Sequence, residues 1–237
     1  MIEHGAIALE WLGYATVRIE GRTGAVVYVD PGRYGVLEGY DARDGDLVLV
    51  THDHHYDPDG IERVAREDAL VVLHEDVEGE RDDVDVTPEE LPYIVERVRE
   101  DESFVAGPLD LFTTPAYNDP DGSHTRPDDE PYHPPGTGCG YGVTIDGVTV
   151  FCPGDTDPLP YHEGMDVDVF LPPIGGHYTM DRLEAADLVG TMGPRLVVPI
   201  HYDTFPEIEA DAGAFVVDVA NRGVPVALET PRPGVGR

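Results

Sequence analysis

The chain has 237 residues, of which 41% are hydrophobic, and this is enough to bury a sizeable core in one or two globular domains. No apolar run approaches the roughly 20 residues needed to cross a bilayer. The first residues also lack the basic start and long apolar segment of a signal peptide. These features predict a cytoplasmic protein with no membrane partner.

The charge of the chain is extreme. Asp and Glu number 48 against 15 Lys and Arg, the formal net charge is −33, and every cation is an arginine. So much like charge disfavours a compact state at ordinary ionic strength, whereas molar salt shortens the Debye length to about 3 Å and screens it. The composition therefore resembles that of proteins from salt-accumulating halophiles such as haloarchaea. It also argues against a nucleic-acid partner, which requires a basic surface.

Several classes of reaction are disfavoured by missing residues. Without lysine, the chain has neither a Schiff-base lysine nor the lysine of a phosphate-binding loop. Its two serines, Ser103 and Ser123, lie outside any G-x-S-x-G motif, which argues against a serine hydrolase. The two cysteines, Cys139 and Cys152, match no zinc or redox spacing and are expected to be small core residues.

The first half of the chain alternates short strands with one helix. Glycine-bearing turns separate the early strands, as hairpins require, and a helix between two buried strands continues a β-α-β rhythm. Residues 75–102 are acidic, partly helical and expected at the surface. The expected strands are 6–9, 15–19, 25–29, 47–50 and 69–73, and the expected helices are 58–68 and, in the acidic region, 88–95.

The second half contains a long loop and further strands. Residues 119–138 are rich in Pro, Asp and Gly, which excludes regular structure, and long ordered loops in compact domains are usually functional. Asp146-Gly147 predicts a hairpin turn. With no internal linker, residues 1–237 are predicted to form a single domain. The expected strands are 109–114, 141–145, 148–151, 167–171, 196–200 and 224–228, and the expected helices are 180–192 and 207–221.

The strongest functional signal lies in residues 47–57, where a buried apolar run opens into three histidines and two aspartates. Open α/β architectures build sites at such strand ends. His52 and His54 are two residues apart and would project to the same side of an extended segment, as two ligands of one metal ion require. Later strands end near Asp155 and at His201. The pattern predicts a metal cleft between sheets, which Asp30 at another strand end could support.

The spacing of these residues resembles that of a known superfamily. The matching segments are Trp11-Leu12-Gly13, Asp30-Pro31, Thr51-His52-Asp53-His54, Gly154-Asp155-Thr156-Asp157, Ile174-Gly175-Gly176, Tyr178-Thr179-Met180-Asp181 and His201-Tyr202. Over nearly its whole length the chain is similar to the metallo-β-lactamase superfamily, and within it to the uncharacterised metal-dependent hydrolases that include ascorbate-lactonase-like proteins. The resemblance implies an α+β fold, an αβ/βα sandwich of two mixed sheets flanked by helices. It also implies that Asp155 bridges two metals and that His201 is the last ligand.

The end of the histidine motif departs from the superfamily pattern, which is His-x-His-x-Asp-His. Counted from His52, the last two places hold Tyr56 and Asp57. With a one-residue insertion, Asp57 would instead take the place of the pattern's aspartate, followed by Pro58 where a histidine is expected. Asp57 is therefore predicted to bind a second ion or to act as the general base.

A second departure concerns the histidine expected after strand 109–114, which falls at Asn118. An amide oxygen is a poor zinc ligand. His133, in the long loop, is predicted to fold back and replace it, while His55 and Asn118 stay open as alternatives. His177 is a candidate for substrate contact near the mouth of the cleft.

The sequence thus predicts a hydrolase that uses a metal-bound hydroxide on a small-molecule ester, lactone, amide or phosphodiester. One or two divalent ions are expected, zinc first, with manganese left open. Two alternatives remain: a metal-binding protein with a degenerate site and no turnover, and a nuclease of the same superfamily. A homo-oligomer is also left open. The predicted metal ligands are His52, His54, Asp57, His133, Asp155 and His201.

Overall fold

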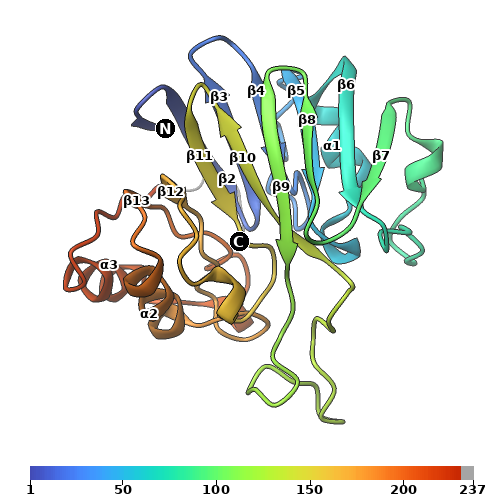
Figure 1. The fold of residues 1–237 in the computed structure, drawn as a ribbon. Helices are drawn as coiled ribbons and strands as arrows, with labels where there is room; N and C mark the ends of the chain where they lie inside the picture. The colour runs from blue at the N-terminus through green and yellow to red at the C-terminus, as the bar shows by residue number, and fades with distance from the viewer. Residues whose placement is uncertain (231–237) are drawn as a thin grey trace.

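Two β-sheets form the centre of the protein in the computed structural model, which describes residues 1–230 (Figure 1). The first sheet has the strand order β1-β2-β3-β4-β5-β6-β7. Its strands pair antiparallel from β1 to β4 and parallel from β4 to β7. The strands are β1 (Ile2–His4), β2 (Ile7–Gly13), β3 (Thr16–Gly21), β4 (Val26–Val29), β5 (Gly45–Val50), β6 (Ala65–His74) and β7 (Ile94–Val98).

The second sheet has the order β13-β12-β11-β10-β9-β8. It is antiparallel from β8 to β11 and parallel from β11 to β13. The predicted Asp146-Gly147 hairpin joins β10 and β11, with Ile145 opposite Val148. The strands are β8 (Ser103–Ala106), β9 (Leu109–Pro115), β10 (Cys139–Ile145), β11 (Val148–Cys152), β12 (Val169–Phe170) and β13 (Leu196–Val197).

Helices pack against both sheets. Helix α1 (Pro58–Val64) packs on the first sheet, while α2 (Arg182–Met192) and α3 (Ala212–Ala220) lie beside β12 and β13 and contact each other. The predicted αβ/βα sandwich is confirmed. Four short 3-10 helices complete the structure: η1 (Asp53–His55), η2 (Pro88–Glu90), η3 (Pro160–His162) and η4 (Pro206–Ile208).

Strand β5 shows why residues 47–50 form an apolar run without alternation. Leu47 and Leu49 belong to the core cluster that the two sheets share, whereas Val48 and Val50 belong to the cluster beneath α1. Successive side chains of a strand point to opposite faces, so a strand covered on both sides must be apolar throughout. This rigid strand ends at the histidine cluster.

Several predicted elements differ from the structure: the helix expected over 207–221 spans only 212–220, and the strands expected over 167–171 and 196–200 are two residues each. Three further differences have a clear physical reason. The helix expected over 58–68 ends at Val64, because the chain from Ala65 onward pairs with β5 in parallel. Residues 88–95 contain only the 3-10 turn η2 before β7 begins, and the strand expected over 224–228 is reduced to a bridge between Val197 and Val226. In each case sheet pairing or its absence overrides local propensity.

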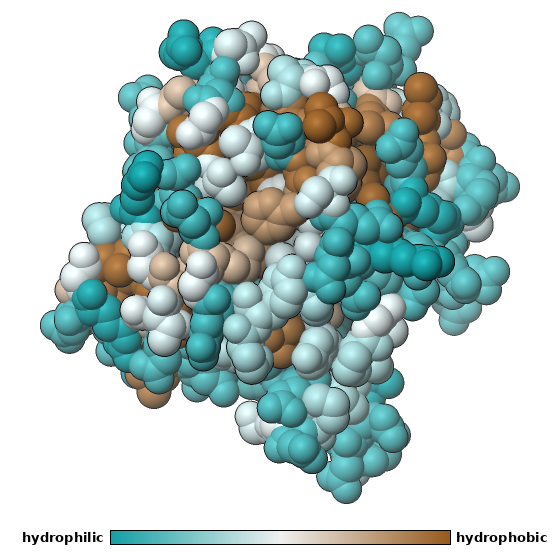
Figure 2. All heavy atoms as spheres, in the orientation of Figure 1, coloured by the Kyte–Doolittle hydropathy of each residue, from teal (hydrophilic) through white to brown (hydrophobic). Residues whose placement is uncertain are grey.

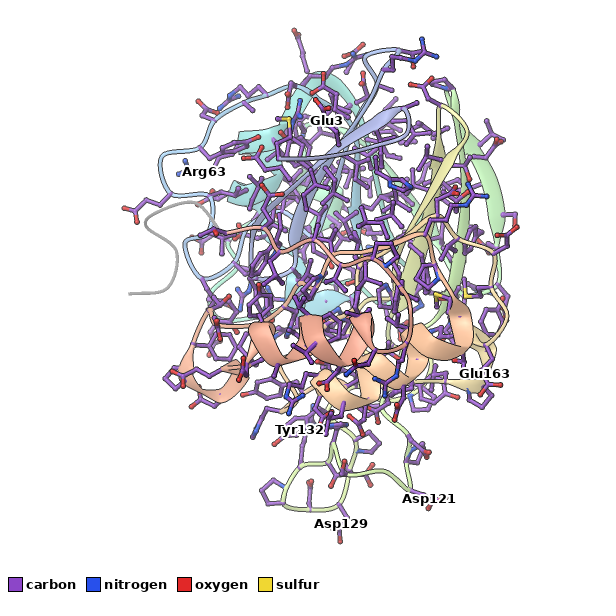
Figure 3. The ribbon with its side chains drawn as sticks, turned by 90° about the vertical axis from the view of Figure 1, so that its left-hand side faces the viewer. Glu3, Arg63, Asp121, Asp129, Tyr132 and Glu163 are labelled. Atoms are coloured by element: carbon purple, nitrogen blue, oxygen red, sulfur yellow. The ribbon has the colours of Figure 1, made fainter. Side chains whose placement is uncertain are left out.

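The loop 116–138, between β9 and β10, projects from one end of the sandwich (Figure 1). Figure 3 places Asp121, Asp129 and Tyr132 at this end, opposite Glu3. Hydrophilic side chains gather over the projection (Figure 2). Cys139 and Cys152 are buried free thiols, as expected. In residues 1–230, no helix is both long enough and apolar enough to cross a membrane.

Candidate metal centre

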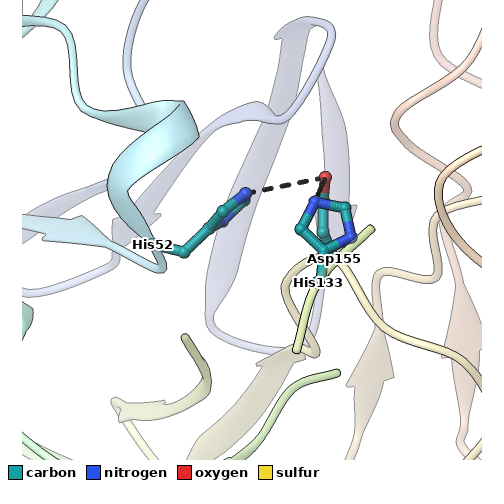
Figure 4. Close-up of side chains that lie close together, drawn as sticks. All are labelled: His52, His133 and Asp155. Atoms are coloured by element: carbon teal, nitrogen blue, oxygen red, sulfur yellow. Dashed lines mark ion pairs between the residues drawn. The ribbon is translucent and has the colours of Figure 1, made fainter. Parts of the chain in front are cut away.

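Four imidazoles surround one carboxylate oxygen at the end of the sandwich that carries the loop 116–138. Their Nε2 atoms lie 3.2 Å (His201), 3.4 Å (His133), 3.6 Å (His55) and 3.8 Å (His52) from Asp155 Oδ2. His52 and His133 point toward Asp155 in Figure 4. These residues form two candidate metal groups that share Asp155: His52 with His133, and His55 with His201.

His55 enters this cluster in place of His54, because the chain turns after β5. The backbone of His52 is extended, with φ −161° and ψ 171°, but Asp53–His55 form the 3-10 turn η1. A 3-10 turn repeats every three residues, so His55 returns to the side of His52. His54 instead places Nε2 3.0 Å from the Tyr34 hydroxyl, and it belongs to neither group.

Asp30 holds His55 in position. Its Oδ2 lies 2.8 Å from His55 Nδ1, and the same carboxylate accepts hydrogen bonds from Thr51 N and Oγ1, each at 2.8 Å. A carboxylate on Nδ1 fixes the tautomer and turns the Nε2 lone pair toward a metal. Asp30 follows β4, which is paired with β5, so this contact arises from the parallel order of the sheet.

Asn118 performs a similar task for His133. The Asn118 side chain is fully buried, and its Oδ1 accepts the His133 backbone N–H at 2.8 Å and lies 3.2 Å from His133 Nδ1. Its amide group donates to Asp157 Oδ1 (3.0 Å) and to the Tyr178 carbonyl (2.9 Å). Asn118 therefore orients His133, and the histidine that the superfamily pattern places near Asn118 is supplied from the loop 116–138.

The cluster leaves buried nitrogens without partners. Within residues 1–230, His52 Nε2 and both ring nitrogens of His201 are buried and make no hydrogen bond. A buried polar atom without a partner costs about 1–3 kcal/mol, which a bound cation would offset. Burial and the neighbouring His55 lower the pKa of His52, so this ring is neutral, as a ligand must be. The residues present thus fit divalent ions.

Asp155 is ionised in this setting. Burial, the largest single influence, would raise the pKa of its carboxyl group, but the combined effect of His201, His55 and His52 outweighs it and holds the pKa well below the usual range. The carboxylate is therefore available as a bridging ligand.

A glycine allows the loop 116–138 to approach His52. Gly138 pairs with His52 in an isolated antiparallel bridge, and a Cβ at Gly138 would lie 2.8 Å from His52 Cβ. Real Cβ atoms do not approach so closely. Only glycine therefore permits the contact that seats the end of the loop against the ligand strand.

Asp57 lies outside the cluster. Its Oδ1 accepts from Gly60 N at 2.9 Å and caps the start of α1, while its Oδ2 accepts from Arg33 N, in the segment after β4, at 2.6 Å. The predicted roles of Asp57 as a ligand and as a general base have no support in this placement. Asp57-Pro58 is the sequence signature of an N-cap followed by proline at the first helical position, and this signal identifies the cap.

A cavity of about 420 Å³ opens beside Asp155 and is lined by histidine, tyrosine and loop residues. Tyr14, which was not among the predicted site residues, is buried with its hydroxyl 3.2 Å from His55 Nε2. Burial raises the pKa of Tyr14 far above its usual value, so the phenol is a neutral hydrogen-bond donor. In the sequence, the only feature that indicated Tyr14 as a site residue was its position directly after Trp11-Leu12-Gly13. His177 contacts the Tyr132 hydroxyl at 3.2 Å.

Comparison with known proteins agrees with this geometry. Residues 8–201 match the family model described as "Beta-lactamase superfamily domain". The fold is similar to that of the metallo-β-lactamase fold protein YhfI from Bacillus subtilis, with a TM-score of 0.66 at 15% identity over 94% of this chain and 95% of that one. The chain belongs to the metallo-β-lactamase superfamily, as its sequence predicted.

Similar proteins indicate which kind of protein within the superfamily this chain is. A UPF0173 metal-dependent hydrolase from Thermococcus kodakarensis is 32% identical over 240 residues, covering 94% of this chain and 96% of the relative. Igni18, a metallo hydrolase from Ignicoccus hospitalis, has a TM-score of 0.70 and 25% identity over 95% of both chains. The protein is a metal-dependent hydrolase.

Proposed function

We propose that the protein hydrolyses a small-molecule ester, lactone, amide or phosphodiester with two divalent ions. The observation that carries this proposal is the convergence of four Nε2 atoms on Asp155 Oδ2. One ion would be held by His52, His133 and Asp155, and the other by His55, His201 and Asp155. Asp155 would bridge the two.

The donor set favours zinc. Each group offers two imidazole nitrogens and one carboxylate oxygen, whereas manganese prefers sites richer in oxygen. Three protein ligands for each ion leave a coordination position open, which is typical of catalytic rather than structural zinc. A bound ion of this kind lowers the pKa of a coordinated water to about 7 and polarises the electrophile.

The residues of the chain would position the reactants. Asp30 and Asn118 orient His55 and His133 through their Nδ1 atoms. The neutral Tyr14 phenol, which lines the cavity, would donate a hydrogen bond to an oxygen that gains negative charge as the bond breaks. Asp57 is given no role in this proposal, since its oxygens accept hydrogen bonds from the backbone amides of Arg33 and Gly60.

Metal content tests the ligand assignment. Purified protein in molar KCl is expected to carry two zinc ions per chain by mass spectrometry of the metal. His55→Ala should lose at least one ion, while His54→Ala, one residue away, should keep both. Loss of zinc from His54→Ala but not from His55→Ala would instead support the arrangement predicted from the sequence, in which His52 and His54 bind one ion from an extended segment.

Turnover tests the reaction. The zinc-loaded protein should hydrolyse at least one member of a panel of aryl esters, lactones, amides and phosphodiesters, and the chelated protein should not. Two bound ions with no turnover on any of these would favour a metal-binding protein with a degenerate site. Cleavage of DNA or RNA alone would favour a nuclease.

A further inference from the structure

The cavity beside Asp155 has aromatic walls apart from its metal ligands. Tyr132 and Tyr178 meet edge to face with ring centroids 4.9 Å apart, and Tyr14 and Tyr34 do so at 4.8 Å. Tyr34 is 45% exposed and packs on Phe205. Tyrosine rings offer flat apolar faces on which a planar or apolar group can pack. The walls therefore suit a substrate with such a body next to the bond that is broken.

One cation lines the same cavity. Arg126 lies in the loop 116–138, where its backbone N–H donates to the Glu130 carbonyl at 2.8 Å and its Nη2 donates to the Tyr132 carbonyl at 3.2 Å. The turn that carries it is closed by a bridge between Thr125 and Pro131. The guanidinium group is thus held beside the tyrosine wall by backbone contacts.

Arg126 has no carboxylate partner among the described residues, although the chain has a large excess of Asp and Glu. Most other described arginines form ion pairs, including Arg33 with Asp83 and Arg81 with Asp53. Asp53, the other acidic side chain lining the cavity besides Asp155, is neutralised by Arg81 and by the amides of residues 78 and 79. A guanidinium group presents five N–H donors, and those of Arg126 are mostly unused.

We propose that the substrate carries a carboxylate, phosphate or similar anionic group, which Arg126 binds while the tyrosine walls pack on a planar or apolar body. This inference rests on the proposed function, because it takes the cavity beside Asp155 to be the substrate site. Arginine matches planar and tetrahedral oxyanions with paired N–H donors. Because the Arg126 guanidinium group forms no ion pair with a described carboxylate, it is available to bind such an anion.

Equilibrium binding of two matched probes tests the inference. Benzenesulfonate is anionic and coordinates zinc weakly, and methyl phenyl sulfone is its neutral counterpart. Calorimetric titration of the zinc-loaded protein at fixed ionic strength should give a dissociation constant at least tenfold lower for the sulfonate. Arg126→Gln should remove this preference and leave sulfone binding unchanged. Arg22→Gln is the matched control, because Arg22 lies in the turn between β3 and β4 and also lacks an ion pair among the described residues.

The outcomes separate this inference from the proposed function. Equal sulfonate binding by wild type and Arg126→Gln, with zinc content unchanged, would overturn the role of Arg126 and leave metal-dependent hydrolysis intact. No preference for the sulfonate over the sulfone would overturn it as well. A preference that depends on Arg126 in a protein without turnover would support the anion site while contradicting hydrolysis. Repeating the titration after chelation shows whether the ions contribute to anion binding.

Discussion

Single residues decide where the ligand nitrogens point. His55, His133 and His52 each place Nδ1 near an oxygen, from Asp30 at 2.8 Å, Asn118 at 3.2 Å and Thr51 at 3.0 Å. With Nδ1–H donated to these oxygens, each Nε2 is left as the acceptor that faces Asp155. The supporting oxygens are therefore as much a part of the candidate centre as the imidazoles.

Replacing Asn118 by alanine tests this support. The change should weaken the binding of one zinc ion about 10- to 100-fold, the usual effect of losing a group that orients a ligand, and leave the second ion unaffected. Competition with a graded chelator resolves the two affinities, and circular dichroism checks that the variant is folded. Equal weakening at both ions would contradict the assignment of Asn118 to the His133 half of the centre.

At the scale of elements, Asp57 is the N-cap of helix α1. Asp57→Ala removes an N-cap, which should lower the free energy of unfolding by about 0.5–2 kcal/mol. The zinc content and kcat should not change, because Asp57 belongs to neither candidate metal group and its two oxygens accept hydrogen bonds from backbone amides. Chemical denaturation and metal analysis measure the two effects. If the Asp57→Ala variant has normal stability but has lost zinc or turnover, Asp57 acts as a metal ligand or general base instead.

His124 is a buried residue of the loop 116–138, and its hydrogen bonds attach the loop to residues outside it. Its Nδ1 lies 2.7 Å from Asp157 Oδ1 and its Nε2 lies 3.1 Å from the Gly176 carbonyl, so the protonated ring can donate at both positions. The hydrogen bond to Asp157 raises the pKa of His124, and Glu184, 3.8 Å away, acts in the same direction. Protonation and attachment of the loop are therefore coupled.

The raised pKa of His124 determines how the stability of the protein changes with pH. A folded pKa above the unfolded value of about 6.5 gives stability that is complete below that pH. This stability is lost as the pH rises through the folded pKa. In chelated protein, wild type should exceed His124→Gln in unfolding free energy by about 1–3 kcal/mol at pH 5.5, and the gap should narrow by pH 9. Urea titrations at both pH values measure it, and a constant gap would contradict the coupling.

These elements also show what the sequence could predict. Buried strands such as 47–50 and the Asp146-Gly147 hairpin follow from local pattern, and the superfamily resemblance identified the layers. Alternation along an extended chain favoured His54, whereas a 3-10 turn of three residues brings His55 to the cluster. The position of His133 depends on closure of a long loop onto Asn118, a contact between distant residues that no local pattern contains.

At the scale of the whole molecule, charge is the dominant feature. The net charge of −33 is spread over a chain of 237 residues. Ion pairs such as Arg18 with Asp44 and Arg97 with Glu89 are partly exposed, and exposed pairs contribute only about 0–1 kcal/mol each. They cannot offset the repulsion among the many carboxylates that have no arginine to pair with. Screening should therefore affect repulsion more than attraction.

The protein is thus predicted to gain stability with salt. Raising KCl from 0.1 to 1 M shortens the Debye length from about 10 to 3 Å, and each kcal/mol of relieved repulsion should raise Tm by about 2–4 °C. Differential scanning calorimetry of chelated protein measures the change. Choline chloride at equal ionic strength is the control: a similar rise identifies screening, whereas a rise with KCl alone identifies specific binding of potassium by carboxylates. An unchanged Tm would mean that the weakening of ion pairs balances the relieved repulsion, and a falling Tm that it outweighs it; either would contradict the prediction.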